Sequence, residues 1–182
     1  CLACLPGQKL VGSTCVVCDE GRYSGIGATT CATCERGRFQ SAKGQASCTA
    51  CAAGKYSDVA EQTTDTCKPC DKGKYSSAQG ATADSQCNSC SPGKYSAVVA
   101  QTSASVCISC LAGTFAASGG LSACTACGAG KASGTGSSVC VACLPGEKLV
   151  GSTCEVCDEG RYSGIGATTC ALCERGRFQS AK

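Results

Sequence analysis

The chain has 182 residues, with 22 cysteines and 24 glycines but no tryptophan, methionine or histidine and only 4% aromatic residues. So few large apolar side chains cannot form a core that offsets the entropy lost on folding, which excludes an ordinary globular domain and indicates stabilisation by cysteine. The formal net charge of +3 comes without any cluster of bases, which argues against nucleic acid or an anionic membrane as a partner. No apolar run approaches the ~18 residues of a membrane span.

A short phrase with two cysteines recurs along the chain. Each copy has two cysteines separated by two residues and a glycine three residues after the second cysteine; most copies have Tyr or Phe two residues after that glycine. The eleven copies hold all 22 cysteines and begin at Cys1, Cys15, Cys31, Cys48, Cys67, Cys87, Cys107, Cys124, Cys140, Cys154 and Cys170. A repeat this regular is typical of an array whose copies stack on one another.

A longer repeat of 139 residues contains the short one. Residues 140–182 match residues 1–43 except at four pairs of positions, Leu2/Val141, Gln8/Glu147, Val16/Glu155 and Thr33/Leu172. We therefore divide the chain into residues 1–139, one long unit of nine cysteine-pair modules, and residues 140–182, the start of the next unit. Because the first residue already lies inside the pattern, we expect the chain to be part of a longer protein.

Each segment between successive cysteine pairs predicts a small β-hairpin or an irregular loop with two short strands, since it is rich in Gly, Ser, Thr and Ala and has no helical pattern. The glycine falls where a tight turn needs positive φ or a close backbone approach, and we expect the aromatic ring to cover a neighbouring disulfide. Each repeat is expected to contact only its neighbours. The structural residues predicted in this way are Gly21, Tyr23, Gly37, Phe39, Gly54, Tyr56, Gly73, Tyr75, Gly93, Tyr95, Gly113 and Phe115.

The cysteines allow more than one disulfide pattern. In a ladder, the second cysteine of each pair bonds the first cysteine of the next pair, and Cys1 and Cys173 bond partners outside this segment. The ladder bonds would be Cys4–Cys15, Cys18–Cys31, Cys34–Cys48, Cys51–Cys67, Cys70–Cys87, Cys90–Cys107, Cys110–Cys124, Cys127–Cys140, Cys143–Cys154 and Cys157–Cys170. A rival pattern cross-bonds two adjacent pairs and needs an even number of pairs per long unit. The long unit has nine, which favours the ladder, although a mixed pattern stays open.

Two other kinds of cysteine chemistry share the motif. Paired CxxC motifs have the ligand spacing of structural zinc sites, but nine pairs do not divide into four-cysteine sites and no histidine is present. A thioredoxin-like redox site needs a single pair at a helix N-terminus, which eleven pairs without helical pattern do not provide. Disulfides without a metal or other cofactor are therefore the leading interpretation. Each ladder bond would contribute roughly 3 kcal/mol in the chain-entropy model, so reduction should unravel the array.

The pattern C-x-x-C-x-x-G-x-[YF], followed by another C-x-x-C, resembles the cysteine-rich repeats of the ephrin-receptor-like and tumour-necrosis-factor-receptor-like families along the whole chain. The resemblance implies an extracellular location, secreted or at the cell surface. It also implies small disulfide-rich repeats in an elongated rod or solenoid of short β-hairpins, with little or no helix and no conventional hydrophobic core. The family's bond, from the cysteine before the glycine to the first cysteine of the next pair, agrees with the ladder. The strict CxxC pattern departs from tumour-necrosis-factor receptors and is more similar to arrays in giant surface proteins.

Two functions fit these features. The first is a structural extracellular rod or filament component, because 39 of 43 aligned residues are identical between the long units and uniform repetition suits a mechanical role. The second is a receptor or adhesion ectodomain that binds a protein or glycan, with the apolar-leaning segment 96–106 as its candidate surface; an inter-repeat contact is the alternative role of this segment. The expected partners are copies of the same chain, or extracellular matrix or glycan. Without histidine or a serine placed beside a base, we do not expect an enzyme. Loop Ser and Thr residues could carry O-linked sugar.

Overall fold

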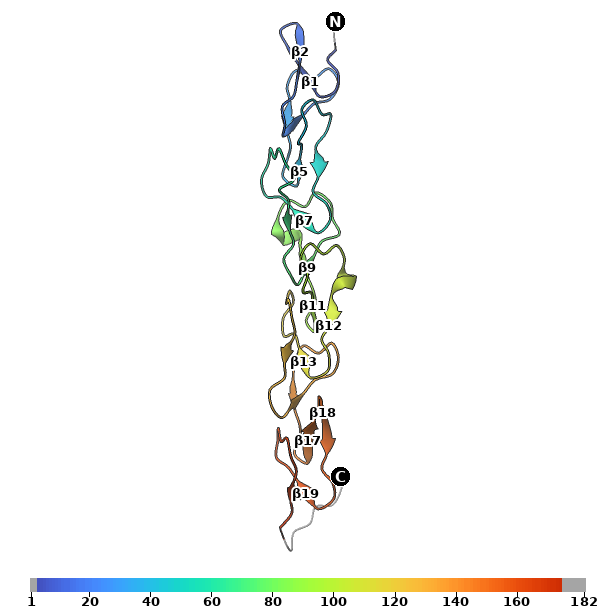
Figure 1. Cartoon of the computed structure of the whole chain (residues 1–182), viewed down its shortest axis with the longest axis vertical. Coiled ribbons are helices and arrows are strands. Elements are labelled where there is room, and N and C mark those ends of the chain that lie inside the picture. The colour runs from blue at the N-terminus through green and yellow to red at the C-terminus, as the bar shows by residue number, and fades with distance from the viewer. Residues whose placement is uncertain (1–2, 175–182) are drawn as a thin grey trace. The chain divides into compact units, whose positions relative to one another are not determined.

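The computed structural model describes residues 3–174, in which short strands alternate with loops (Figure 1). The helical elements of that range are two 3₁₀ turns, η1 (Asp84–Gln86) and η2 (Ala104–Val106). The strands are β1 (Gln8–Val11), β2 (Thr14–Val17), β3 (Arg22–Tyr23), β4 (Ala32–Thr33), β5 (Arg38–Phe39), β6 (Thr49–Ala50), β7 (Lys55–Tyr56), β8 (Lys68–Pro69), β9 (Lys74–Tyr75), β10 (Asn88–Ser89), β11 (Lys94–Tyr95), β12 (Ile108–Ser109), β13 (Thr114–Phe115), β14 (Thr125–Ala126), β15 (Lys131–Ala132), β16 (Val141–Ala142), β17 (Glu147–Val150), β18 (Thr153–Val156), β19 (Arg161–Tyr162) and β20 (Ala171–Leu172). Each odd-numbered strand pairs with the next even-numbered one, which confirms the prediction of small hairpins with little helix.

Each hairpin is closed by one disulfide. We call the segment from the second cysteine of one pair to the first cysteine of the next a rung, and number the rungs 1 to 10 from the N-terminus. The disulfides are Cys4–Cys15, Cys18–Cys31, Cys34–Cys48, Cys51–Cys67, Cys70–Cys87, Cys90–Cys107, Cys110–Cys124, Cys127–Cys140, Cys143–Cys154 and Cys157–Cys170. They form a ladder of consecutive rungs, with the same ten pairs that the ladder interpretation expects.

The longest hairpins lie at equivalent places in the long repeat. Strands β1 and β2, like β17 and β18, have four residues each, whereas the other strands have two. In both long hairpins only a glycine and a serine separate the strands, and the glycines, Gly12 and Gly151, have φ of +63° and +61°. A two-residue turn with glycine first suits the twist of a hairpin, so these strands pair without a loop between them.

The interior consists of disulfides. Apart from half-cystines, the buried apolar side chains of residues 3–174 are Ala81 and Ala116. In most pairs the second cysteine is the more deeply buried one; Cys34, Cys51 and Cys70 are all 0% exposed. Large aliphatic side chains remain outside, as Ile26 and Leu111 show with 74% of their surface exposed. Sulfur therefore occupies the place that a hydrophobic core would take in a globular domain.

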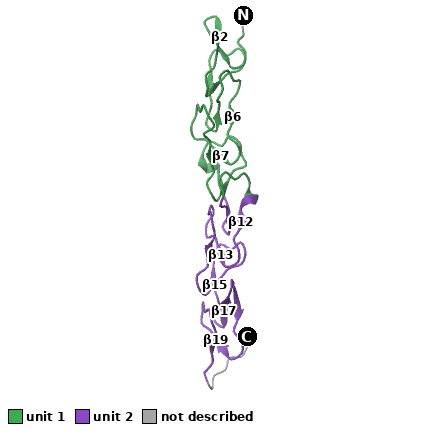
Figure 2. Cartoon of the chain, in the orientation of Figure 1, with its two compact units in different colours: residues 1–88, 98–104 green, residues 89–97, 105–182 purple. Residues whose placement is uncertain are grey.

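The chain packs as two compact units (Figure 2). Unit 1 comprises residues 1–88 and 98–104, and unit 2 comprises residues 89–97 and 105–182. Rung 6 thus contributes its loop to unit 1 and its disulfide to unit 2. These packing units are distinct from the repeats 1–139 and 140–182, which are defined by sequence. No helical element within residues 3–174 has the length and apolar character needed to cross a bilayer.

Candidate functional site: the junctions between rungs

In most phrases of the described chain, the glycine joins its rung to the next one through the backbone. In unit 1, the N–H of Gly37 in rung 3 donates to the carbonyl of Ser57 in rung 4 at 3.0 Å, and the Gly37 carbonyl accepts from the N–H of Cys51 at 2.8 Å. The equivalent glycine N–H bonds are Gly7 to Ser24, Gly21 to Gln40 and Gly54 to Ser76 in unit 1, and Gly93 to Ala116, Gly113 to Ser133 and Gly146 to Ser163 in unit 2. The six predicted glycines, Gly21, Gly37, Gly54, Gly73, Gly93 and Gly113, have φ between 73° and 82°.

A second set of backbone bonds runs in the other direction, from the loop of one rung to the preceding rung. In rung 5, the N–H of Gly80 donates to the carbonyl of Cys51 in rung 4 at 2.8 Å. We call the donors loop-tip residues; the other bonds are Gly27 to Cys4, Gly44 to Cys18, Glu61 to Cys34 and Ala100 to Cys70 in unit 1, and Gly120 to Cys90, Gly136 to Cys110 and Gly166 to Cys143 in unit 2. All eight loop-tip residues have positive φ, between 55° and 79°.

The loop-tip residue also reaches two rungs back. The Gly80 carbonyl lies so close to Gly37 of rung 3 that a Cβ on Gly37 would collide with it. The same approach joins Gly7 with Gly44, Gly21 with Glu61 and Gly54 with Ala100 in unit 1, and Gly93 with Gly136 and Gly130 with Gly166 in unit 2. The expectation that each repeat contacts only its neighbours is therefore wrong, because each loop folds back past the preceding rung before returning to its own disulfide.

Two loop-tip residues are not glycine. Glu61 and Ala100 have φ of 55° and 58°, in a region that costs an L-residue roughly 1–2 kcal/mol. The Glu61 side chain forms an ion pair with Arg22, the residue after the glycine that its own carbonyl approaches. Both groups are about half exposed, so the pair adds little stability, but it links rungs 2 and 4 by side chains as well as backbone.

One segment of the chain matches a known family of repeats. Residues 21–64 match the family described as tyrosine-protein kinase ephrin type A/B receptor-like. The disulfide order and junction hydrogen bonds of that segment recur from Cys4 to Cys170. Together with the ladder of consecutive disulfides in the described residues, this match supports an ephrin-receptor-like cysteine-rich repeat array. A comparison with curated proteins found no match.

The sulfur chemistry of the array bears on its location. Disulfides persist in oxidising compartments, so ten of them in ephrin-receptor-like repeats suggest an extracellular or secreted location. Half-cystines carry no thiolate, so the twenty bonded cysteines are not available as zinc ligands. Cys173 is half-buried and unbonded within the described residues, and Cys1 lies outside them. The bonds expected for these two cysteines stay predictions.

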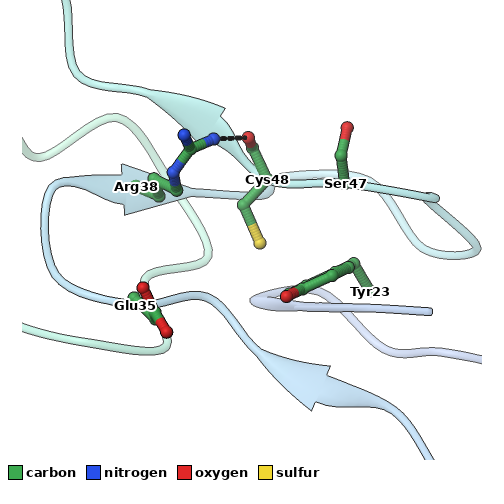
Figure 3. Close-up of a pocket in the computed structure, with 5 residues that line it drawn as sticks. All are labelled: Tyr23, Glu35, Arg38, Ser47 and Cys48. Carbon is green, nitrogen blue, oxygen red and sulfur yellow. Dashed lines mark hydrogen bonds between the residues drawn. The ribbon is translucent and has the colours of Figure 1, made fainter. Parts of the chain in front are cut away.

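The aromatic position of one rung lies near the disulfide of the next rung in the array. Tyr23 of rung 2 and Cys48, which closes rung 3, line the same surface cavity of about 330 Å³. The Cys48 side chain is directed toward Tyr23, and Arg38 donates to the Cys48 carbonyl at 3.0 Å (Figure 3). The remaining predicted aromatic residues, Phe39, Tyr56, Tyr75, Tyr95 and Phe115, are half-buried. For these five, disulfide cover by the ring stays a prediction.

The residue that follows the aromatic position has a structural role that the sequence did not predict. The buried polar side chains are Ser24, Gln40, Ser57, Ser76, Ser96 and Ser133, and every one of them directly follows that position. The Ser24 hydroxyl donates to the Gln8 carbonyl of the preceding rung at 2.8 Å, and the Ser133 hydroxyl donates to the Thr114 carbonyl at 2.9 Å. The recurrence of serine after Gly-[Arg/Lys]-Tyr was the available signal.

We expect Ser24→Ala to lower the free energy of unfolding by about 1 kcal/mol, because the Gln8 carbonyl loses its hydroxyl donor. The methyl fits, since Ala116 occupies the equivalent place in rung 7. Denaturant titration with the disulfides intact measures the loss, and Ser13→Ala, at an exposed serine, is the matched control. Equal midpoints for the two variants would contradict a junction role for the buried hydroxyl.

Exposed ion pairs also occur in unit 1; one joins rungs 2 and 3, and another lies within the β7–β8 hairpin of rung 4. The Lys43 ammonium lies 3.0 Å from Asp19 and the Lys68 ammonium lies 2.9 Å from Asp58. The hydrogen bond from Lys43 lowers the pKa of Asp19, and that from Lys68 lowers the pKa of Asp58. A carboxyl with a lowered folded-state pKa contributes stability above its unfolded pKa and loses it as pH falls through the folded pKa.

We therefore expect acidification below the ordinary Asp pKa of 3.8 to release both ion pairs without unfolding the hairpins. The carboxylates are protonated in that range, but the disulfides are unaffected by acid. Carbon-13 shifts of the two carboxyl groups follow the titration, and circular dichroism follows the strands. Cooperative loss of the strands over the same pH range would show that the ion pairs hold the fold.

Proposed function

We propose that the array is part of a structural extracellular rod or filament, in which tandem rungs act as a covalently reinforced spacer. The observation that carries this proposal is that the long unit repeats with its junctions preserved. Gly7 and Gly146, at the same place in the two copies, donate to Ser24 and Ser163 at 2.8 and 3.1 Å. In a binding protein, the repeat that binds the ligand normally differs in its surface residues from the other repeats, whereas uniform repetition suits a mechanical role.

The sequence differences between the two copies spare the junction contacts. Gln8 and Glu147 make the same hydrogen bond, since their side-chain oxygens accept from the N–H groups of Leu5 and Leu144 at 3.3 and 3.0 Å. Val16 is 42% exposed, and its counterpart Glu155 is exposed too. Thr33 and Leu172 are both exposed. Leu2 lies outside the described residues.

The junctions suit a spacer because they use backbone groups. Every residue carries the same N–H and C=O, so a rung can change most of its side chains and still bond its neighbours. Neither kind of junction bond requires a ligand, and the proposal gives the array no catalytic role, in keeping with the lack of histidine. Its partners would be further copies of the chain, or extracellular matrix or glycan.

The proposal is tested by imaging the native protein beside arrays of one, two and three 139-residue units. Negative-stain micrographs and small-angle scattering are expected to give a length that grows in proportion to the number of units. Sedimentation velocity then tests whether the copies associate laterally. Compact particles whose longest dimension does not grow with unit number would refute the rod.

One observation favours a receptor or adhesion ectodomain as the second candidate. In segment 96–106, Val98 and Val99 are 58% and 42% exposed. The next residue, Ala100, docks by its backbone on Cys70 and against Gly54. The segment thus makes inter-repeat contacts and also presents two apolar side chains to solvent, where a protein partner can bury them.

Adhesion of coated beads to cells or to one another tests this second candidate. A variant with Val98→Ser and Val99→Ser should lose adhesion, while Val59→Ser, at another valine that is 52% exposed, should keep it. Undiminished adhesion of the double variant would remove this segment as the binding surface and leave the spacer.

A further inference from the structure

Two surface cavities of unit 1 lie at equivalent junctions. The first is lined by Tyr23 of rung 2 and by Cys48, which closes rung 3 (Figure 3). The second, of about 240 Å³, is lined by Lys9 of rung 1 and by Cys31, which closes rung 2. Lys9 occupies the aromatic position of its phrase, five residues after the second cysteine. The residue at this position therefore faces the disulfide of the following rung in both cases, but it is a ring in one and a lysine in the other.

The half-cystine that closes a rung is buried only where the preceding rung carries an aromatic residue. Four closing half-cystines are 6–9% exposed, and the preceding rungs carry Tyr or Phe; they are Cys48, Cys67, Cys87 and Cys107. Three are half-buried after rungs that carry Lys9, Ala132 and Lys148 instead; they are Cys31, Cys154 and Cys170. Cys124 and Cys140 are half-buried although Tyr95 and Phe115 precede them. A ring is thus necessary for burial of the sulfur but not sufficient.

We propose that the disulfides Cys18–Cys31 and Cys143–Cys154, together with Cys157–Cys170, the copy of the first, are sites at which a small-molecule thiol opens the array by thiol–disulfide exchange. Attack occurs at Cys31 and Cys154, because their partners Cys18 and Cys143 are 1% and 0% exposed. Exchange rates depend on access to the attacked sulfur, so a half-buried sulfur that no ring covers reacts before a buried one.

The step is an exchange in which atoms and electrons balance. The thiolate attacks the Cys31 sulfur, a new disulfide forms between the small thiol and Cys31, and the bond to Cys18 breaks. Cys18 leaves as a thiolate and takes a proton from water. A second thiol then releases Cys31, and the two small thiols are oxidised to their own disulfide while the protein disulfide is reduced.

The charges around Cys31 assist this step. Lys9 and Arg22 line the same cavity, and a cation stabilises both the incoming thiolate and the Cys18 thiolate that leaves. The acid in the cavity, Asp19, is hydrogen-bonded to Lys43 at 3.0 Å, which offsets its charge. At Cys154 the preceding rung has Ala132, so that site tests exposure without an added cation at the aromatic position.

The sites belong to the 139-residue period. The phrases without an aromatic residue begin at Cys124 and Cys140, and the phrase beginning at Cys1 is the earlier copy of the latter. Each long unit therefore places its uncovered disulfides on two successive rungs, and a thiol would open the array at regular intervals. This inference does not depend on whether the array is a spacer or an adhesion domain.

The test uses reduced glutathione as the probe thiol on the native chain. Samples are quenched with N-ethylmaleimide over time, and peptide mass spectrometry follows the modification of each cysteine. We expect Cys18–Cys31 and Cys143–Cys154 to open before Cys34–Cys48. Because rung 9 is interior to the described chain, early opening there is not a fraying end. Opening of Cys34–Cys48 at the same rate would overturn the proposal.

Variants at the aromatic position separate cover from charge. Ala132→Tyr should slow the labelling of Cys154 toward the rate of Cys48, and Tyr23→Lys should make Cys48 as reactive as Cys31. Lys9→Tyr should slow the labelling of Cys31 to the rate of Cys48. Lys9→Ala should slow it less, because it removes the positive charge but leaves the sulfur uncovered. The non-reduced mass of each variant verifies its ten disulfides. Unchanged labelling of Cys48 in a correctly bonded Tyr23→Lys variant would refute the role of the ring, because Cys48 is buried only while a ring precedes it.

Discussion

Full reduction of the disulfides is expected to abolish the hairpins at neutral pH without denaturant. The bonds join cysteines 11 to 17 residues apart, and the chain-entropy model values each at roughly 3 kcal/mol. Ala81 and Ala116 are the buried apolar residues of the described chain besides half-cystines, and two methyl groups cannot replace that stabilisation. The junction hydrogen bonds would be lost with the hairpins, since each one needs two ordered rungs.

Proton NMR of the protein after treatment with a phosphine reductant and alkylation measures this effect. We expect amide dispersion to collapse, while alkylation without reductant leaves it unchanged. A single-bond variant, Cys51→Ser with Cys67→Ser, should lose only about 3 kcal/mol and should expose amides chiefly in rungs 3 to 6. Slowly exchanging hairpin amides in the fully reduced chain would mean that the loops hold themselves together without sulfur.

The cysteine spacing was enough to predict the hairpins and the order of the disulfides. The segments between pairs are too short and too polar to hold a helix with an apolar face, and a two-residue strand fits between the cysteines of each pair. The preferred ladder followed from counting, because nine pairs per long unit cannot be grouped two by two. These features depend on spacing along the chain, which a sequence displays directly.

The junctions could not be predicted in the same way. Contacts between rungs n and n+2 are made mainly by backbone atoms, which are the same in every residue type, so a glycine is the sequence feature that indicates them most directly. Where the loop-tip residue is Glu61 or Ala100, even that feature is absent. The buried serine after the aromatic position was visible as a repeated letter, but its importance appears only when Ser24 is seen to bond the preceding rung.

The variation in rung length is compatible with a constant junction. Rung 2 places its loop-tip residue Gly27 three residues after Ser24, and rung 5 places Gly80 four residues after Ser76. In both cases the loop-tip N–H donates, at 2.8 Å, to the carbonyl of the cysteine with which the preceding rung begins. Added residues lie in the part of the loop that returns to the disulfide, as in rung 5, where η1 fills the return. Length can therefore vary along the long unit without changing the backbone pattern that links the rungs.

Replacing the junction glycine is the second change with a large expected effect. Gly37→Ala places a methyl group at a φ of 77°, which costs an L-residue roughly 1–2 kcal/mol. The same methyl group collides with the Gly80 carbonyl two rungs later, and a backbone atom cannot move aside as a flexible side chain can. We expect the free energy of unfolding to fall by more than the backbone strain alone would cost. We also expect faster hydrogen exchange at the Gly80 amide, which is bonded to the Cys51 carbonyl.

Two other glycines separate the causes of this loss. Gly12 has a φ of 63° but open space around it, so Gly12→Ala carries the strain without the collision. Gly25 has neither a positive φ nor a close neighbour. Gly25→Ala should therefore be neutral, or slightly stabilising because alanine lowers the conformational entropy of the unfolded chain. With the disulfides intact, urea titration should rank the variants with Gly37→Ala least stable, then Gly12→Ala, then Gly25→Ala. Equal losses for Gly37→Ala and Gly12→Ala would show that the approach between rungs n and n+2 contributes nothing, because only the shared backbone strain would then remain.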